Sequence, residues 1–136
     1  MRSVAAKDVF NAVCSFRRGS AGGLDGLTPQ HLKDLLCSGA GEAGDALLRE
    51  LTGLMNLMLS GNVDDGIIDI LYGANLCALK KRDGGIRPIA IGCTYRRMAA
   101  KLCCNFYSRD LSEKFQPLQL GFGLKGGCEA AIHALQ

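Results

Sequence analysis

The residues of this chain best suited to chemistry are cations that gather between residues 80 and 109. This segment holds eight Lys and Arg residues against one acid, Asp83, so its formal charge is +7 in a chain whose net charge is +3. The other residues together therefore carry a charge of −4. Lysine binds phosphate as a point charge, and arginine binds it through a planar fork of donors. The segment is expected to meet an anionic partner, and the simpler alternative is a basic face that only water solvates.

A β-hairpin is predicted to carry the first of these cations. Apolar residues alternate along residues 76–79 and 86–91, and the Asp83-Gly84-Gly85 string between them is typical of a tight hairpin turn. Pro88 cannot donate a ladder hydrogen bond, so its strand should be an edge strand. The hairpin would gather four cations near one tip: Lys80, Lys81, Arg82 and Arg87.

A helix is predicted to follow the hairpin, with Thr94 as its N-cap. Three cations fall in its first two turns: Arg96, Arg97 and Lys101. Each opposes the helix macrodipole by about 0.3 to 1 kcal/mol when exposed. A phosphate backbone or a nucleotide triphosphate would compensate, because helix N-termini and basic side chains both bind phosphate.

Four strings along the chain resemble conserved blocks of reverse transcriptases, most closely those of non-LTR retrotransposons. In chain order they are Gly23-Leu24-Asp25-Gly26-Leu27-Thr28; Lys80-Lys81-x-Asp83-Gly84-Gly85-x-Arg87-Pro88-Ile89; Arg96-Arg97 with Lys101; and Gln119-Leu120-Gly121-Phe122-Gly123 with Gly126. The first is similar to the upstream block of non-LTR and group II intron enzymes. The second and third resemble the first two conserved blocks, and the last resembles the block just before the catalytic palm. Together they stand in the order of the family and cover nearly the whole chain.

The resemblance implies a role for each group of residues. Lys81 and Arg87 would contact the triphosphate of the incoming dNTP, with Lys80 as the alternative in register. Gly121 and Phe122 would approach the nucleotide and the template. The cations of the second block, Arg96, Arg97 and Lys101, would lie along the template or the nucleotide. Arg17 and Arg18 either suit the end of a helix as capping cations or lie close to template RNA, and both interpretations remain open.

Catalysis is not expected from this chain alone. Nucleotidyl transfer by a polymerase needs paired carboxylates that hold two metal ions about 4 Å apart. The Asn62-Val63-Asp64-Asp65 string has two such acids but lacks the aromatic residue of the family's Tyr-x-Asp-Asp box and precedes the first block. Its acids suit the first turn of a helix instead. We therefore expect no catalytic and no metal-binding residue here, and Mg²⁺ only in a complete polymerase, so enzymatic activity stays open.

The seven cysteines favour a reducing compartment. They form no Cys-x-x-Cys pair and are odd in number, which argues against a zinc ribbon and a closed disulfide framework. Lys7 and Asp8 interrupt any secretory pattern, and no apolar stretch reaches the roughly 20 residues of a membrane span. The expectation is an intracellular protein, cytoplasmic or nuclear, without a membrane partner.

Periodicity predicts a mainly helical α+β fold with one antiparallel β-hairpin. Beside the basic helix, helices are expected over residues 3–17, 28–37, 43–60, 65–72 and 127–136. Their inward faces would include Ile67, Ile68 and Leu71 in the fourth of these and Ala131, Ile132 and Leu135 in the last. We expect a single partial domain over residues 1–136, and the resemblance implies an incomplete polymerase fingers subdomain with the entry to the palm.

Three functions stay open on the sequence alone. The chain is either the fingers part of a retrotransposon reverse transcriptase, a non-catalytic RNA-binding module, or an inactive transposon relic. The first implies template RNA, an RNA/DNA hybrid, dNTP and the missing palm and thumb regions as partners. A polyphosphate site would require Arg87 to lie near Lys81 and the second-block cations, free of internal salt bridges.

Overall fold

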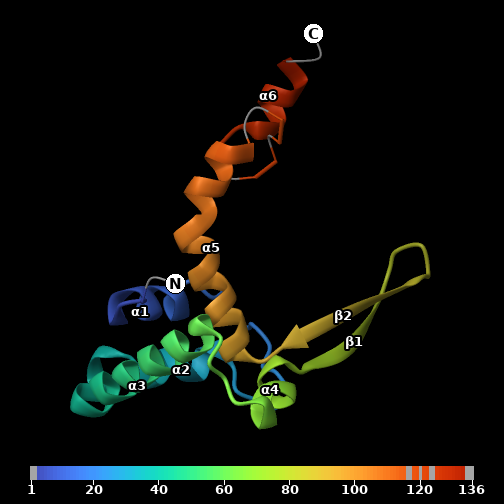
Figure 1. The fold of residues 1–136 in the computed structure, drawn as a ribbon. Coiled ribbons are helices and arrows are strands. Elements are labelled where there is room, and N and C mark those ends of the chain that lie inside the picture. Colours follow the sequence, from blue (N-terminus) through green and yellow to red (C-terminus); the bar gives the residue numbers. More distant parts are fainter. Residues whose placement is uncertain (1–2, 116–117, 120, 123–124, 134–136) are drawn as a thin grey trace. The chain divides into compact units, whose positions relative to one another are not determined.

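The computed structural model describes residues 3–115, 118–119, 121–122 and 125–133. These residues divide into two compact units, Met1–Leu102 and Cys103–Gln136, which we describe separately. The helices and strands follow in chain order, with Figure 1 giving their labels. They are α1 (Ala6–Cys14), α2 (Pro29–Leu35), the 3₁₀ turn η1 (Ser38–Ala40), α3 (Gly41–Ser60), α4 (Asp65–Tyr72), β1 (Ala74–Lys80), β2 (Ile86–Gly92), α5 (Thr94–Phe115) and α6 (Gly127–His133).

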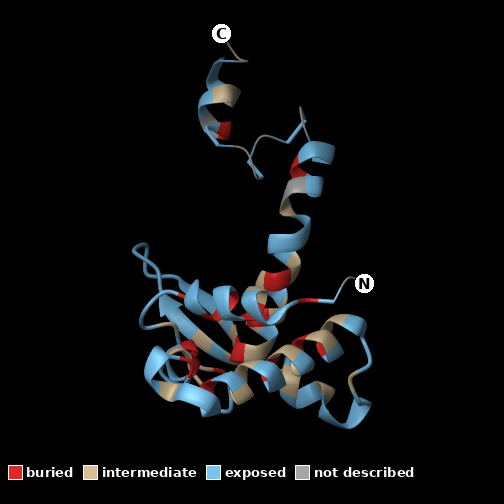
Figure 2. Cartoon of the chain, turned by 90° about the vertical axis from the view of Figure 1, so that its left-hand side faces the viewer, coloured by how far each residue is buried: buried red, intermediate tan, exposed pale blue. Residues whose placement is uncertain are grey.

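The core of the first unit lies between α1, α2, α3 and the start of α5. Residues four apart share one face of a helix, so each helix offers the core a row of apolar side chains. The buried rows are Val9 and Val13 of α1, Leu51 and Met55 of α3, and Met98 and Leu102 of α5. Figure 2 shows buried residues along the facing sides of these helices.

Helix α1 is shorter than the predicted range 3–17. The preceding segment is extended because it is bound to α3: the Val4 N–H donates to Asn56 Oδ1 at 2.8 Å, and Asn56 Nδ2 donates to the Val4 carbonyl at 3.2 Å. The helix starts after Ala5, whose N–H donates to the Asp8 carboxylate, so its first residue lies three positions later than the predicted start at residue 3. The helix ends at Cys14, which leaves Arg17 and Arg18 beyond its last turn. Their interpretation as helix-ending cations is therefore wrong.

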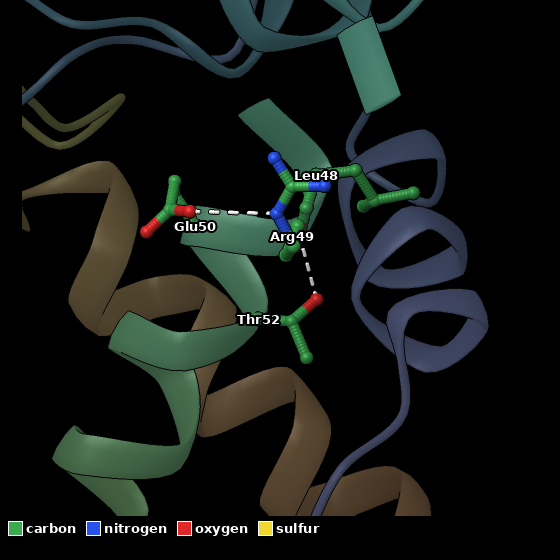
Figure 3. Close-up of polar contacts among 4 residues, drawn as sticks. All are labelled: Leu48, Arg49, Glu50 and Thr52. Atoms are coloured by element: carbon green, nitrogen blue, oxygen red, sulfur yellow. Dashed lines mark hydrogen bonds and ion pairs between the residues drawn. The ribbon is translucent and has the colours of Figure 1, made fainter. Parts of the chain in front are cut away.

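Helices α2 and α3 largely follow the prediction. Thr28 caps α2 by accepting a hydrogen bond from the His31 N–H, and Pro29 occupies the first helical position. Within α3, Thr52 Oγ1 donates to the Leu48 carbonyl at 2.7 Å, and Arg49 and Glu50 form an ion pair of 3.6 Å (Figure 3). The side chains of that pair are 73% and 80% exposed, so it adds little to stability.

Helix α4 is confirmed, although its inward face is only partly as predicted. Asp64 caps it by accepting a hydrogen bond from the Gly66 N–H at 2.8 Å. Leu71 and Ile68 are half-buried, whereas Ile67 is 42% exposed and so does not turn inward. The physical reason is that α4 carries apolar residues around most of its circumference, and one core can cover only part of them.

The predicted hairpin is confirmed. Strands β1 and β2 pair antiparallel, with Ala78 opposite Pro88 and Leu79 opposite Arg87. The Lys81 N–H closes the turn by donating to the Gly85 carbonyl at 2.7 Å. Gly84 has a φ of +85°, a backbone conformation that favours glycine. One face of the hairpin is half-buried toward its base. The other face is covered at the base, at Ala74 and Gly92, and is exposed from there to the turn through Leu76, Ala78, Ile86, Pro88 and Ala90.

The second unit consists of the later part of α5, a loop and α6. Phe115 and Phe122 pack edge to face with ring centroids 5.7 Å apart. Ile132 of α6 is 59% exposed, so its predicted inward position is wrong, because the described residues of this unit do not cover it. The Leu135 position and the side chain of Ala131 lie outside the described residues.

The expected fold class is confirmed: the chain is mainly α-helical with one antiparallel β-hairpin. Among the described residues, no helix combines the length and the apolarity that crossing a bilayer would take.

Candidate phosphate-binding site on the hairpin

The turn end of the hairpin forms an open cavity of about 480 Å³. Its lining comprises Leu79, Lys80, Lys81, Arg82, Asp83 and Arg87. Four of these six residues are cations, and all six side chains are exposed. The sequence prediction that these four cations converge on one tip is thus confirmed in geometry.

Strand register decides which cations share a face. Arg87 lies opposite Leu79, whereas Lys80 lies opposite Ile86. Successive side chains of a strand point to opposite faces, so Lys80 and Arg87 lie on different faces of the ladder. Lys81 follows Lys80 by one residue and lines the same cavity as Arg87.

No ion pair among the described residues neutralises the cations of the tip. The carboxylate of Asp83 accepts a hydrogen bond from the Gly85 N–H at 3.0 Å and so shapes the turn. Within the described part of the chain, Arg87 forms no ion pair with a carboxylate. Four like charges therefore remain close together in solvent, an arrangement that an anionic ligand would stabilise.

The cations at the start of α5 are engaged differently, because they hold the fold together. Arg96 Nη1 donates to the Tyr72 carbonyl at 2.8 Å, at the end of α4. Arg97 Nη2 donates to the Ala21 carbonyl at 2.7 Å. Both guanidinium groups thereby donate to backbone carbonyls of neighbouring segments. These hydrogen bonds within the chain explain why two arginines stand in the first turn of the helix without a bound ligand.

The ring of Phe16 forms the centre of a second set of contacts. The Arg97 Cζ atom lies 5.4 Å from the ring centroid and Lys101 Nζ lies 4.7 Å from it. Both distances fall within the range of cation–π attraction. The sequence did not reveal this cluster, because the aromatic residue and the two cations lie far apart along the chain.

The start of α5 is capped by a residue other than the one predicted. Thr94 is the first residue of the helix and is fully buried, and its Oγ1 donates to the Leu27 carbonyl at 2.5 Å. Cys93 takes the N-cap place: its Sγ accepts a hydrogen bond from the Arg96 N–H at 3.4 Å and donates to the Leu71 carbonyl at 2.8 Å. The prediction of Thr94 as N-cap is therefore wrong, because its hydroxyl is used in a tertiary contact.

The glycine-rich loop of residues 19–27 lies directly on this junction. A Cβ atom at Gly23 would approach Cys93 Cα to 2.5 Å, so only glycine lets the two backbones come so close. Asp25 accepts a hydrogen bond from the Leu27 N–H at 3.1 Å, and this contact orients the loop. The first family-like string therefore lies against the start of α5, the helix that carries the third string, at the base of the hairpin.

The tip and the base of the hairpin are separate cationic groups. Gly92 follows Arg87 by five residue steps along β2, which at about 3.3 Å per step amounts to about 17 Å. Figure 1 shows the turn at the end of the hairpin away from the start of α5. The structure thus brings Arg87 together with Lys81, and it does not bring Arg87 together with the second-block cations.

The remaining predicted site residues lie elsewhere. Arg17 and Arg18 are both exposed in the turn after α1. Gly121 and Phe122 belong to the second unit, where Phe122 is 38% exposed. Among the described residues, no group of three or more His, Cys, Asp or Glu side chains could hold a metal ion.

Comparison with known proteins adds one finding. The chain is similar to a retrotransposon protein. It is 28% identical over 131 residues to the "Retrotransposable element SLACS 132 kDa protein" of Trypanosoma brucei gambiense. The alignment covers 96% of this chain and 10% of that protein, so the chain spans about a tenth of the length of the relative it matches. No family model and no solved structure matches the chain.

Proposed function

We propose that this chain is the N-terminal fingers part of a retrotransposon reverse transcriptase and that the hairpin tip binds the triphosphate of an incoming dNTP. The observation that carries the proposal is the cluster of four exposed cations around one cavity, where Arg87 forms no ion pair with a carboxylate of the described residues. The similarity to a retrotransposon protein supports the same class of function.

The two principal contacts are assigned to Arg87 and Lys81. The guanidinium of Arg87 can bind two phosphate oxygens at once, and the ammonium of Lys81 can neutralise a third. The strand register favours Lys81 over Lys80 for this pairing, because Lys80 lies on the other face of the ladder. A projecting hairpin that closes over a bound nucleotide would hold these charges against the phosphates while bond formation takes place.

Template RNA is the second ligand of the proposed fingers part. Arg17 and Arg18 are exposed and lie outside the helix that precedes them, so they are available to phosphate groups. The template would also be contacted by three cations of α5, through donor atoms that their contacts within the chain do not use: Arg96, Arg97 and Lys101. Gly121 and Phe122 would approach the template and the nucleotide from the loop before α6.

Catalysis itself is assigned to other parts of a longer protein. Paired carboxylates and Mg²⁺ would come from a palm region, and a thumb region would hold the RNA/DNA hybrid. In this proposal the present chain contributes nucleotide binding and template binding, and it is not catalytic alone.

The proposal is tested by titrating the full chain with tripolyphosphate and following backbone amide shifts by NMR. We expect shifts at residues 80–87 and a loss of affinity of about 10- to 100-fold in Arg87→Ala, since hydrogen bonds to charged groups contribute about 1.5 to 3 kcal/mol. Lys7→Ala removes an exposed cation of α1 and serves as the control with equal charge. Unchanged affinity in Arg87→Ala would contradict the assignment.

A non-catalytic RNA-binding module is the second candidate, favoured by the two adjacent exposed arginines after α1. The same titrations separate the candidates. A chain that binds single-stranded RNA but not tripolyphosphate is such a module, and one that binds neither is a relic without retained binding.

A further inference from the structure

The hairpin joins the rest of the first unit through two short connections, which we name its roots. The entry root is Gly73, the single residue between α4 and β1, and the exit root is Cys93, the single residue between β2 and α5. The ladder pair of Ala74 with Gly92 lies next to both roots. Figure 1 shows the hairpin leaving the unit between α4 and the start of α5. Contacts that fix the two roots relative to each other therefore fix the direction in which the hairpin projects.

Arg96 links the two roots. It follows the exit root by three residues, and its Nη1 donates to the carbonyl of Tyr72, just before the entry root, at 2.8 Å. Its side chain also passes close to the end of β2, because a Cβ atom built at Gly92 would lie 3.5 Å from Arg96 Cδ. One side chain thus connects the end of α4 to the start of α5 across the base of the hairpin.

The thiol of Cys93 adds a second link beside the first. Its Sγ donates to the Leu71 carbonyl at 2.8 Å and accepts a hydrogen bond from the Arg96 N–H at 3.4 Å. Leu71 and Tyr72 are the last two residues of α4, and the last carbonyls of a helix have no partner within that helix. Side chains at the start of α5 therefore provide the hydrogen bonds that the end of α4 lacks.

Arg97, the next residue, offers a comparison within the same helix. Its Nη2 donates to the Ala21 carbonyl at 2.7 Å, and its Cζ lies 5.4 Å from the centroid of the Phe16 ring. Neither Ala21 nor Phe16 belongs to the hairpin or to α4. Two neighbouring arginines thus form the same kind of hydrogen bond, but only the bond of Arg96 links the roots.

The length of the hairpin amplifies any motion at its base. Arg87 lies about 17 Å from Gly92 along β2, so a rotation of about 20° at the base would move Arg87 by about 6 Å. In a reacting complex a misplacement of about 1 Å can already cost a large factor in rate. Apolar contacts at the half-buried face are non-directional, whereas a hydrogen bond has a preferred direction. A directional link at the roots is therefore suited to hold the tip in place.

We propose that Arg96 is a positioning residue: it sets the direction of the hairpin by linking the end of α4 to the start of α5, and it does not bind the ligand of the tip. The purpose of this positioning rests on the proposed function, in which the tip must meet the phosphates of a nucleotide. The link itself needs no ligand. Arg96 is also absent from the lining of the tip cavity, which agrees with a role at a distance.

The test measures the orientation of the hairpin in the full chain by residual dipolar couplings of backbone amides. In the wild type, one alignment tensor should fit β1 and β2 together with α1 and α3. Arg96→Met keeps an aliphatic stem beside Gly92 and removes the donors. In this variant the order parameter of the hairpin amides, relative to α1 and α3, should fall from about 0.85 to below about 0.6. Unchanged couplings within α1 and α3 would show that the variant stays folded.

Arg97→Met is the matched control, because it removes the same groups from the neighbouring position. It should lower stability without changing the hairpin couplings, a difference that a general stabilising role of both arginines would not produce. Tripolyphosphate titration supplies the second measurement. Arg96→Met should bind tripolyphosphate with the affinity of the wild type, since the cations of the tip all belong to the hairpin and its turn.

Four results would overturn the inference. They are a hairpin that already moves independently in the wild type, hairpin couplings of Arg96→Met that equal those of the wild type, an equal change in Arg97→Met, and a loss of tripolyphosphate affinity of about tenfold in Arg96→Met, which would make Arg96 a ligand contact. A wild-type chain that does not bind tripolyphosphate at residues 80–87 would instead contradict the proposed function. The dipolar couplings would still decide the role of Arg96 in that case.

Discussion

Gly23 has no room for a side chain, because a Cβ atom there would lie 2.5 Å from Cys93 Cα. We expect Gly23→Ala to lower the free energy of unfolding by about 1 to 3 kcal/mol, the usual range for overpacking. Urea denaturation followed by circular dichroism measures the change. Gly53→Ala is the matched control, because a Cβ atom at this exposed position of α3 meets nothing within 4 Å. That substitution should stabilise the chain by about 0.5 to 1 kcal/mol.

Substitution of Arg97 tests whether this side chain stabilises the fold. Its side chain donates to the Ala21 carbonyl and lies against the ring of Phe16. Arg97→Ala should therefore lower the free energy of unfolding by about 1.5 to 3 kcal/mol, the range for a hydrogen bond that involves a charged group. Thermal and urea unfolding measure this loss. Arg18→Ala removes an exposed arginine and should change stability by less than about 0.5 kcal/mol. Equal stabilities of the two variants would refute the structural role.

Residue types alone predicted the cluster of cations at the hairpin tip. They did not predict that Cys93 caps α5 or that Thr94 bonds to Leu27. Capping preferences describe a helix by itself, whereas Thr94 is buried against a loop that lies far away along the chain. Local chemistry was decisive where a residue acts on its neighbours, and it was insufficient where the partner comes from a distant segment.

At the scale of elements, the hairpin is expected to be the least protected part of the first unit. It is a two-stranded sheet with one face exposed beyond its base, and isolated two-stranded hairpins are marginally stable in water. Hydrogen exchange measured by NMR should therefore be faster for amides of β1 and β2 than for those of α1 and α3, which line the core. Equal protection of the hairpin and these helices would contradict this expectation.

The elements themselves were largely readable from the sequence. The Asp-Gly-Gly turn with flanking alternation predicted the hairpin, and the row of Leu and Met residues predicted α3. Boundaries were less accurate for α1, where the bonds between Val4 and Asn56 keep the preceding segment extended. The exposure of Ile67 was also missed, because apolar periodicity indicates a helix without telling how much core is available to cover it.

At the scale of the whole molecule, the uneven charge predicts salt-dependent RNA binding. The logarithm of the affinity for single-stranded RNA should fall with the logarithm of salt concentration by about 0.7 for each phosphate contacted. If Arg17 and Arg18 each contact a phosphate, the variant with both changed to Ala should lose about 1.4 from that slope. Filter binding at several salt concentrations measures the slopes. An unchanged slope would remove these two arginines from the RNA contacts.

The sequence showed that the chain has one strongly basic segment, but it did not show that the cations of this segment form two separate groups in space. Counting residues placed eight of the 16 Lys and Arg residues in the segment 80–109, beside a single acid. Only the strand register and the contacts of Arg96 and Arg97 separated a ligand-accessible group at the tip from a structural group at the base.

The open edges of β1 and β2 have a consequence for the behaviour of the chain in concentrated solution. Unpaired backbone groups at a sheet edge invite a neighbouring molecule to add its own strand. When two hairpins pair edge to edge in the same direction, their cationic tips lie next to each other, and the four cations of each tip repel those of the other. Charge reversal at the tip, or neutralisation by high salt, would remove this barrier to self-association. The cluster proposed to recognise phosphate thus also acts as a safeguard against aggregation.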